Sequence, residues 1–260
     1  MTMRQNMNQF IGFRALLSRE ILRFTSVFKQ TLFPPIISSF LFISIFGYFI
    51  GRNLTMAENT PYLTFLVPGL VMMYLIESSY QNTSTSLFIA RWSGYIQELL
   101  VTPLSYVEMV LAMLLGSMVR SVVVSAGVFA VSLFFERTAI MHPWVVLYFM
   151  FFVSLTFSSV GLLAGLIAEE WEHISILTTF IMTPFIYFGG VFHSAQNIPH
   201  LFQVLMQFNP IFYMVNGMRY GMIGVSDVDF KISMIVVLVF FSVLFSVVVW
   251  MFSQGYKLKK

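Results

Sequence analysis

Two ionisable side chains, Glu77 and Arg120, lie inside long apolar stretches of this 260-residue chain. A charge at the centre of a membrane-spanning helix costs about 2.5–3.5 kcal/mol on insertion scales, so it usually faces water, the bundle interior or an opposite charge. The two residues are therefore expected either to line a transport pathway or to form an intramembrane ion pair. A structural role is favoured, either as that ion pair or with the Arg120 guanidinium extended to the interface along a tilted helix.

Side chains that carry most enzyme chemistry do not occur in recognisable arrangements. The chain has no G-x-x-x-x-G-K-[ST] phosphate loop, no H-E-x-x-H pair and no G-x-S-x-G turn. Its 4 histidines are scattered, and Glu172 and His173 are sequence neighbours, which places them on different sides of a helix. The absence of cysteine excludes disulfides and thiolate metal sites. We therefore expect no catalytic residue, metal site, cofactor or nucleotide site in this chain.

Residues 91–105, with the sequence R-W-S-G-Y-I-Q-E-L-L-V-T-P-L-S, form the most informative segment. We expect them to form a short helix between two membrane spans, ended by Pro103. Ile96, Leu99 and Leu100 fall on one side of that helix. A short apolar helix exposed to the cytosol is poorly placed unless it docks into something, and the alternative is an amphipathic helix lying on the bilayer.

Composition indicates the elements that hold these residues. Hydrophobic residues make up 58% of the chain and charged residues 10%, whereas soluble domains carry about a quarter charged residues. Because so few charges cannot cover a water-facing surface, apolar side chains must face lipid. A helix needs about 20 apolar residues to cross the hydrocarbon core. Six segments meet that length: Thr31–Gly51, Tyr62–Gln81, Tyr106–Phe135, Trp144–Ala168, Ile174–Phe192 and Ile232–Phe252.

The distribution of Lys and Arg predicts the orientation, since these residues stay on the cytoplasmic side. With six spans, the side that holds both chain ends carries nine of them: Arg4, Arg14, Arg19, Arg23, Lys29, Arg91, Lys257, Lys259 and Lys260. The other side carries four: Arg52, Arg137, Arg219 and Lys231. Both termini are therefore expected in the cytoplasm.

The second span continues into an unusually polar run, from Ser78 to Ser86. Such a run either hydrates a cytoplasmic vestibule or marks the point where the helix leaves the bilayer. Both alternatives stay open from the sequence alone.

The N-terminal segment predicts a helix that associates with the membrane without crossing it. Arg19 and Arg23 fall on one helical face, opposite a face with apolar residues at spacings of three and four. That apolar face consists of Phe10, Phe13, Leu17, Ile21, Phe24 and Phe28. The pattern is typical of a helix lying flat in the interface with its basic face toward lipid phosphates; packing against a partner protein is an equal alternative. We therefore divide the chain into residues 1–28, a cytoplasmic amphipathic helix, and residues 29–257, the transmembrane domain.

Residues 193–230, between the fifth and sixth predicted spans, contain apolar pieces too short to cross a membrane. These pieces, 198–208 and 211–223, are broken by Pro and Gly residues. Short apolar helices with such breaks suggest a re-entrant helix pair that enters the membrane from outside. Irregular backbone at that depth is tolerated only where protein or a water-filled cavity covers it.

Fragments over nearly the whole chain resemble type-2 ABC transporter permeases. Residues 91–105 are similar to the family's cytoplasmic E-L-L-x-x-P signature, and the other fragments follow in the family's order. The other fragments are F-P-P-I (33–36), F-L-V-P-G-L (65–70), T-P-F-I-Y-F-G-G-V-F (183–192) and F-N-P-I-F-Y-M-V-N-G-M-R-Y-G (208–221). The chain looks most like the YadH-like, drug-exporter and nodulation-factor-exporter branch.

The resemblance implies an all-α membrane protein with six transmembrane helices, cytoplasmic termini, an N-terminal interface helix and extracellular re-entrant helices before the last span. It also implies a homodimer in the bacterial inner (plasma) membrane, paired with two copies of a separate ATP-binding cassette ATPase subunit that holds ATP and Mg. The residues of the coupling helix would be Arg91, Tyr95, Ile96, Gln97, Glu98, Leu99, Leu100 and Pro103. The re-entrant helices would include Pro199, Asn209, Pro210 and Arg219.

We therefore expect the permease subunit of an ATP-driven exporter, without enzymatic activity of its own. Its cargo would be amphipathic (a drug-like molecule, lipid or glycan-lipid) and would leave the cytoplasm or inner leaflet by alternating access. One alternative is an ion-driven secondary transporter, which normally shows paired repeats and several acidic residues at the midplane; Glu77 is thin support for it. Another is a membrane sensor or assembly factor docked to an ATPase. No nucleic-acid partner is expected.

Overall fold

The computed structural model describes residues 2–51, 54 and 60–258, with side chains for all of these except residues 2–8, 50 and 197. Arg52, Lys259 and Lys260, which enter the charge count above, lie outside the described residues. The described chain is helical and contains no strand. Its α-helices are α1 (Thr2–Ser26), α2 (Phe28–Phe42), α3 (Tyr62–Trp92), α4 (Ile96–Val101), α5 (Tyr106–Ser132), α6 (Pro143–Ile167), α7 (Trp171–Ile176), α8 (Thr183–Tyr187), α9 (His200–Gln207), α10 (Pro210–Ile223) and α11 (Phe230–Ser253).

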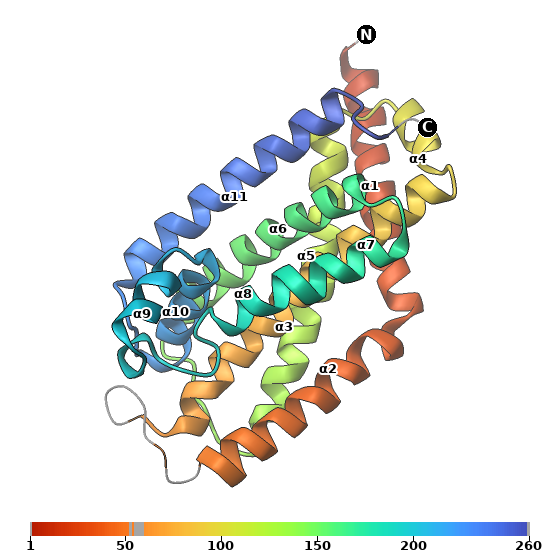
Figure 1. Ribbon diagram of the computed structural model, residues 1–260. Coiled ribbons are helices and arrows are strands. Elements are labelled where there is room, and N and C mark those ends of the chain that lie inside the picture. The colour runs from red at the N-terminus through yellow and green to blue at the C-terminus, as the bar shows by residue number, and fades with distance from the viewer. Residues whose placement is uncertain (1, 52–53, 55–59, 259–260) are drawn as a thin grey trace.

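The long helices form one elongated bundle (Figure 1). The first residues of α1, the last residues of α11 and the short helix α4 lie at one end, which we call the terminal end. The short helices α9 and α10 lie at the other, which we call the opposite end.

Five helices of the described ranges are long and apolar enough to cross a membrane. They are Phe28–Phe49, which joins α2 to the π-helix η1 (Ile43–Ile50), and α3, α5, α6 and α11. These five correspond to five of the six predicted spans. The remaining predicted span, Ile174–Phe192, is the fifth along the chain and covers the end of α7, the π-helix η4 (Leu177–Met182) and α8, which are joined end to end. The helix stops at Tyr187, before a turn at Gly190 in which φ is +82°; the six-span count stays a prediction.

Helix α3 is the central element of the bundle. It packs against α5, α6 and α10, and most of its 31 residues are buried. The polar run Ser78–Ser86 lies well within this helix, which continues to Trp92. Most of the run is therefore neither a helix end nor a wetted surface: it forms the contact between α3 and its neighbours.

Hydroxyl groups join the three central helices where that polar run is buried. Thr83 Oγ1 of α3 donates to the carbonyl oxygen of Ser158 in α6, at 2.8 Å. Ser158 Oγ donates to Ser117 Oγ of α5 at 2.8 Å, and Ser117 Oγ donates to the carbonyl oxygen of Ser79 in α3 at 3.0 Å. Such hydrogen bonds, together with small residues, are the usual means by which helices associate in lipid.

Two glycines of α6 allow its backbone to approach α3 closely. A Cβ at Gly161 would collide with Thr83 Oγ1 and the carbonyl oxygen of Tyr80. A Cβ at Gly165 would lie 2.8 Å from the carbonyl oxygen of Ser84. Because backbone atoms cannot rotate aside as side chains do, these positions require glycine.

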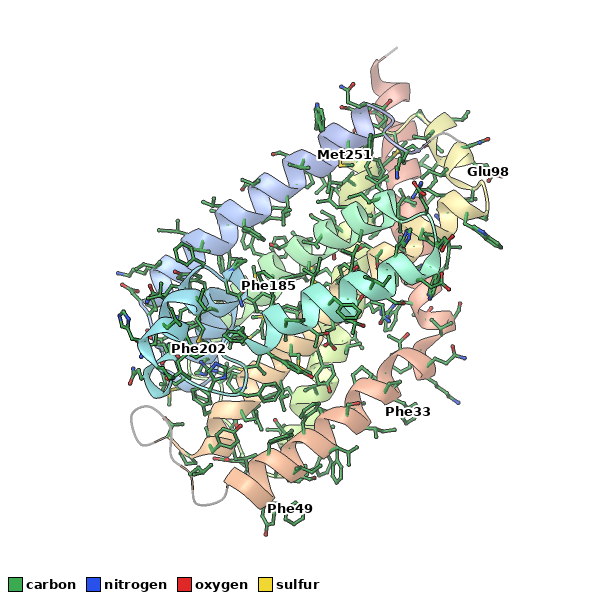
Figure 2. All side chains as sticks on the ribbon, viewed as in Figure 1. Phe33, Phe49, Glu98, Phe185, Phe202 and Met251 are labelled. Carbon is green, nitrogen blue, oxygen red and sulfur yellow. The ribbon has the colours of Figure 1, made fainter. Side chains whose placement is uncertain are left out.

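Helix α1 packs along α5, so it is covered on one face by this chain itself. Leu16, Glu20 and Phe24 are at most 4% exposed, whereas Phe10, which belongs to the predicted apolar face, is 66% exposed. The buried face is therefore rotated from the predicted one and has a carboxylate at its centre. After a turn at Val27, the chain continues in α2, whose Phe33 points away from the bundle (Figure 2).

Replacing Gly161 with alanine should destabilise the fold by about 1–3 kcal/mol, the usual cost of overpacking. The matched control is Gly127→Ala in α5, because a Cβ there would meet only the flexible side chains of Leu32 and Ile36, at 3.3–3.6 Å. The measurement is thermal unfolding of the two variants purified in detergent. A Gly161 variant that unfolds at the temperature of the Gly127 variant would contradict the close contact between α3 and α6.

Candidate functional site

The predicted coupling segment lies at the terminal end, in the connection from α3 to α5, where Glu98 stands at the edge of the molecule (Figure 2). The α3 helix ends after Trp92, and Gly94, with φ +80°, turns the chain into α4. Ser105 then caps α5 through a reciprocal pair of hydrogen bonds with Glu108. Both ends of the segment are therefore fixed by local geometry.

The two sides of α4 differ in what they contact. Ile96 is 4% exposed and Leu99 is 7% exposed, and both belong to a buried cluster with residues of α1, α5 and α6. The apolar side expected to need a partner is thus covered by the chain itself. The side left for another molecule consists of Trp92, Gln97, Glu98, Val101 and Pro103, which are exposed.

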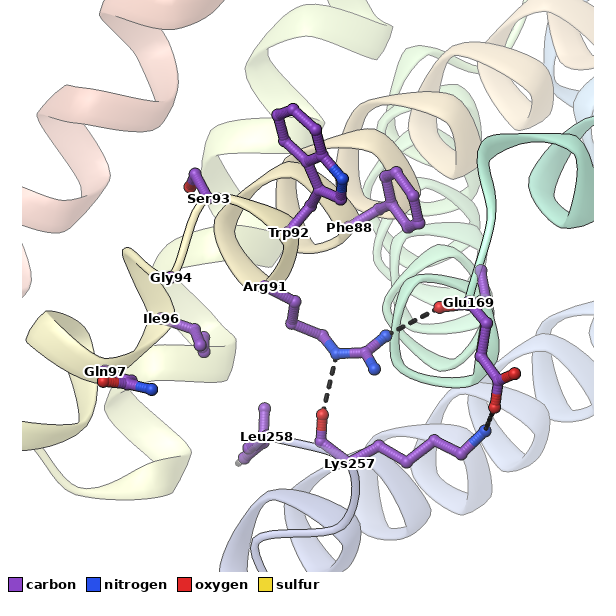
Figure 3. Close-up of a pocket in the computed structure, with 11 residues that line it drawn as sticks. Phe88, Arg91, Trp92, Ser93, Gly94, Ile96, Gln97, Glu169, Lys257 and Leu258 are labelled. Atoms are coloured by element: carbon purple, nitrogen blue, oxygen red, sulfur yellow. Dashed lines mark hydrogen bonds and ion pairs between the residues drawn. The ribbon is translucent and has the colours of Figure 1, made fainter. Parts of the chain in front are cut away.

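Arg91 holds three parts of the terminal end together. Its NH1 donates to the carbonyl oxygens of Gly165 at 2.7 Å and Ala168 at 2.9 Å, both at the end of α6. Its Nε donates to the carbonyl oxygen of Lys257 in the C-terminal tail, at 2.8 Å. These contacts border a cavity of about 460 Å³ between the α3–α4 turn, the α6–α7 turn and the tail (Figure 3).

The C-terminal tail is a component of this site that the sequence analysis did not assign. Gly255 (φ +66°) and Lys257 (φ +51°) turn the tail back toward the end of α3, and Leu258 is 2% exposed. Lys257 Nζ lies 2.8 Å from Glu169 Oε1, and this hydrogen bond lowers the pKa of the Glu169 carboxyl. A glycine just after the last helical turn, followed by an apolar residue, was the available signal, because it is typical of a helix C-cap that packs back on the helix.

Glu77 and Arg120 both line a second, larger cavity, which we call the lateral groove. It measures about 700 Å³ and lies between α1, α2, α3, α5 and Trp171. Its other lining residues are Arg23, Val27, Gln30, Thr31, Pro34, Pro35, Ser38, Tyr74, Ser78, Gln81, Thr85 and Ile89. The ion pairs of the described residues do not include Glu77 with Arg120. Arg120 NH1 instead donates to Asn82 Oδ1 at 3.2 Å. The pathway role of the two residues stays a prediction.

A buried polar network beside the groove fastens α1 to α3. Ser86 Oγ lies 2.9 Å from Glu20 Oε2, and Glu20 is 1% exposed. Arg23 NH2 lies 3.2 Å from the same carboxylate oxygen and donates to Asn82 Oδ1 at 2.9 Å. Arg23 was predicted to face lipid phosphates, but it turns inward because Glu20 and Asn82 offer it acceptors. Glu20 is also the signal that could have revealed this network, since it is a carboxylate on an otherwise apolar stripe.

The coupling segment is also tied to α1. The guanidinium of Arg19 lies over the ring of Tyr95, with 4.0 Å from Cζ to the ring centroid. Nearer the N-terminus of α1, a Cβ at Gly12 would lie 3.1 Å from the Leu104 side chain. A movement of α4 would therefore reach α1 through direct contacts.

The four residues predicted for the re-entrant helices lie at the opposite end. Pro199 precedes α9, while Asn209 caps α10 and Pro210 begins it. Arg219 is buried in α10, with its Cζ 3.7 Å from the Phe65 ring centroid and its NH1 3.7 Å from Asp227 Oδ2.

Arg219 thereby connects α10 to three other parts of the opposite end. Its NH2 donates to the carbonyl oxygen of Gly190 at 2.6 Å. Asp227 in turn accepts a hydrogen bond from Ser194. One buried guanidinium thus joins α10 to Gly190 and Asp227, whereas α9 leaves most of its side chains exposed.

No arrangement in the described part of the chain resembles a catalytic centre. Within residues 2–51, 54 and 60–258, no three His, Asp or Glu side chains gather closely enough to hold a metal ion. The molecule has a short helix with one exposed side at the terminal end, a charged groove along its side, and a cap built around Arg219 at the opposite end.

The chain is similar to known membrane transport proteins. Residues 11–223 match the family model of the ABC-2 type transporter. The chain is 37% identical over 252 residues to the inner membrane transport permease YadH of Escherichia coli K12, covering 94% of this chain and 95% of that protein. It is 22% identical over 185 residues to nodulation protein J of Rhizobium leguminosarum bv. trifolii, covering 70% of this chain and 69% of that protein.

Replacing Arg91 with methionine should release the C-terminal tail. Methionine keeps an apolar stem but removes the donors to Gly165, Ala168 and Lys257. Since hydrogen bonds to charged groups contribute about 1.5–3 kcal/mol, amide exchange in residues 254–258 should accelerate about ten- to hundredfold. Hydrogen-exchange mass spectrometry measures this, with Arg14→Met on the exposed face of α1 as the control. Unchanged exchange in the tail would show that Arg91 does not hold it.

The Glu169–Lys257 pair should make the attachment of the tail pH-dependent. The folded pKa of Glu169 lies below its ordinary value of 4.5, so the pair contributes above that value and is lost as the pH falls through the folded pKa. Tail protection, corrected for intrinsic exchange, should therefore drop between about pH 5 and pH 3. In Glu169→Gln the side chain at 169 does not titrate, so the drop in tail protection that comes from loss of the Glu169–Lys257 pair should be missing. A drop of the same size in that variant would assign it to another group.

Proposed function

The chain belongs to the ABC-2 type transporter family, and on this premise we propose that it is the permease subunit of an ATP-driven exporter in a bacterial inner membrane. The family match and the five long apolar helices make it a membrane permease. The earlier resemblance to this family, including the branch of YadH and nodulation protein J, is confirmed by the comparisons. The proposal adds the direction of transport, the energy source and the cargo class.

The observation that carries the proposal is the construction of the terminal end around α4. Its outer side exposes Trp92, with 73% exposure, and Val101, with 86% exposure, next to Gln97 and Glu98. Large apolar side chains that protrude among polar ones are typical of protein contact sites. The inner side is fixed by Ile96, Leu99 and the Arg91 contacts. A rigid, partner-facing helix fits the role of docking a separate ATPase subunit and transmitting its movement.

The arrangement also supports the proposed orientation in the membrane. The start of α1, the end of α11 and α4 all lie at the terminal end (Figure 1), and Lys and Arg favour that side in the sequence. We place this end in the cytoplasm, with α7, η4 and α8 completing a sixth span. The opposite end, with α9 and α10, then faces outward as the re-entrant pair. Helix α10 is covered by α3, α6 and α11, as membrane depth requires of such a segment, while Leu201 and Leu205 of α9, and Phe208 just after it, expose their apolar side chains.

An amphipathic cargo is supported by the lateral groove. Its lining combines charged and hydroxyl groups with apolar side chains such as Pro34, Pro35 and Trp171. A ligand with a polar head and an apolar body would find both environments there. A homodimer would enclose such grooves between two copies of the chain, each paired with one ATPase subunit that binds ATP and Mg.

The test of the proposed function is purification of the tagged chain from its native membrane. An ABC-class ATPase subunit should copurify, and reconstituted vesicles should move an amphipathic cargo only when ATP is supplied. Ion-gradient-driven transport by the chain alone would establish a secondary transporter instead. ATP hydrolysis without cargo flux would establish a sensor or assembly factor.

Replacing Val101 with aspartate should weaken association with the ATPase subunit at least about tenfold, because it places a charge in the apolar centre of the contact. The matched control is Gln254→Asp, which adds the same charge at an exposed position of the terminal end outside α4. The measurement is the amount of ATPase subunit retained by each variant at equal membrane expression. Equal retention would remove α4 from the docking surface.

A further inference from the structure

The two arginines that line the lateral groove share one acceptor oxygen. Arg23 NH2 and Arg120 NH1 both point at one oxygen, Asn82 Oδ1, at 2.9 Å and 3.2 Å. Arg23 has a carboxylate partner in Glu20, at 3.2 Å. Arg120 forms no ion pair with any carboxylate in the described part of the chain. A buried cation without a counter-charge is costly in free energy, so an additional anion beside Arg120 would be stabilised.

Unpartnered polar atoms point to the same kind of ligand. Buried atoms without a hydrogen-bond partner include Nε of Arg23 and of Arg120, Nδ2 of Asn82 and the hydroxyl of Ser78. Ser78 is 6% exposed and lines the groove, so its hydroxyl is buried at the groove wall. Buried polar groups are nearly always hydrogen-bonded in folded proteins. Three of these four atoms can only donate, which favours a ligand rich in acceptor oxygens.

The rest of the groove suits an apolar body attached to that acceptor group. Val27, Pro34, Pro35 and Ile89 contribute apolar surface, and Trp171 adds an aromatic ring from α7. A volume of about 700 Å³ falls in the range of small-molecule sites, about 300–1,000 Å³. The groove thus has one polar, positively charged region and one apolar region.

We propose that the lateral groove binds the anionic head group, a phosphate or a carboxylate, of an amphiphile. Arg120 is its principal contact, Arg23 is the second, and Ser78, which also lines the groove, supplies a further donor. This inference rests on the proposed function, because it narrows the amphipathic cargo to an anionic one.

Glu77 determines how far along the groove the head group can lie. It precedes Asn82 by five residues on α3, which separates the two by about 7–8 Å along the helix axis. A carboxylate at that place disfavours an anion beside it. The head group is therefore held at the level of Asn82 and Arg120, nearer the terminal end, and the apolar body extends past Glu77 or out of the groove.

Binding of radiolabelled phosphatidic acid to the purified chain in detergent micelles tests this site without an ATPase subunit. We expect the chain to prefer phosphatidic acid to phosphatidylcholine and Arg120→Gln to weaken binding about tenfold or more, as loss of a charged hydrogen bond predicts. Arg120→Lys should stay within about threefold of the wild type, since it keeps the charge. Arg14→Gln, which removes an exposed charge from α1, should bind as the wild type does.

Glu77→Gln is the matched variant within the groove. It removes an acidic group from the same lining, so it should bind phosphatidic acid at least as tightly as the wild type. Opposite effects of Glu77→Gln and Arg120→Gln would assign the binding to charge rather than to a damaged groove. Equal losses in both variants, with unchanged thermal unfolding, would overturn the proposal.

Further arms separate the possible occupants. Inorganic phosphate that competes as effectively as the lipid, mole for mole, would identify a site for a free anion and overturn the amphiphile. A shift of Arg120→Gln from dimer to monomer, with no preference for phosphatidic acid in the wild type, would make the groove an interface between two copies. A chain that copurifies with an ATPase but shows no preference for phosphatidic acid would keep the proposed function and refute this site. A chain that prefers phosphatidic acid but copurifies with no ATPase would keep this site and refute the proposed function.

Discussion

The close contact between α3 and α6 is the constraint on which the remaining structure depends. Lipid gives helices no hydrophobic reason to associate, so they must gain contact energy from close approach and from interhelical hydrogen bonds. Gly161 and Gly165 provide the approach, and Thr83 and Ser158 provide the hydrogen bond. Arg91 can reach the carbonyl oxygen of Gly165 only because α6 lies this near. The terminal end is thus a consequence of packing in the middle of the bundle.

The charges of α1 form a second layer of dependence on α3. A buried carboxylate such as Glu20 is stable only with its partners in place, and removing one partner of a buried pair typically costs about 3–5 kcal/mol. Ser86 and Arg23 are those partners, so α1 has one position along α3 at which its charges are satisfied. Through Arg19 and Tyr95 that position also sets the distance between α1 and the coupling segment. The N-terminal helix is therefore structurally continuous with the bundle, whatever else it contacts at the membrane surface.

The sequence predicted those parts of the fold that follow from local pattern. Apolar length predicted the five long helices that can cross a membrane, and Pro103 and the glycine at 94 fit the short helix between α3 and α5. Local pattern in the sequence could not predict which side of a helix would be covered by which neighbouring helix. The apolar side of α4 and the inward turn of Arg23 depend on α1, α5 and Asn82, which lie far away in sequence. The same is true of Glu77 and Arg120: their presence in one groove depends on helix packing, whereas their unusual depth was evident from the sequence alone.

The placement of these groups along α3 limits how they can move relative to one another. With 31 residues, α3 is about 46 Å long at 1.5 Å per residue. Pro68 lies near its start and leaves the preceding turn without one backbone hydrogen bond, so bending is easiest there. Phe65, which contacts Arg219, lies before this point, and Glu77, Asn82 and Arg91 lie after it. Because the helix is uninterrupted from Gly69 to Trp92, the donors of the groove and the contacts of the coupling segment belong to one stiff element. A displacement at α4 therefore moves the groove directly, and the flexible point lies between the groove and the cap around Arg219.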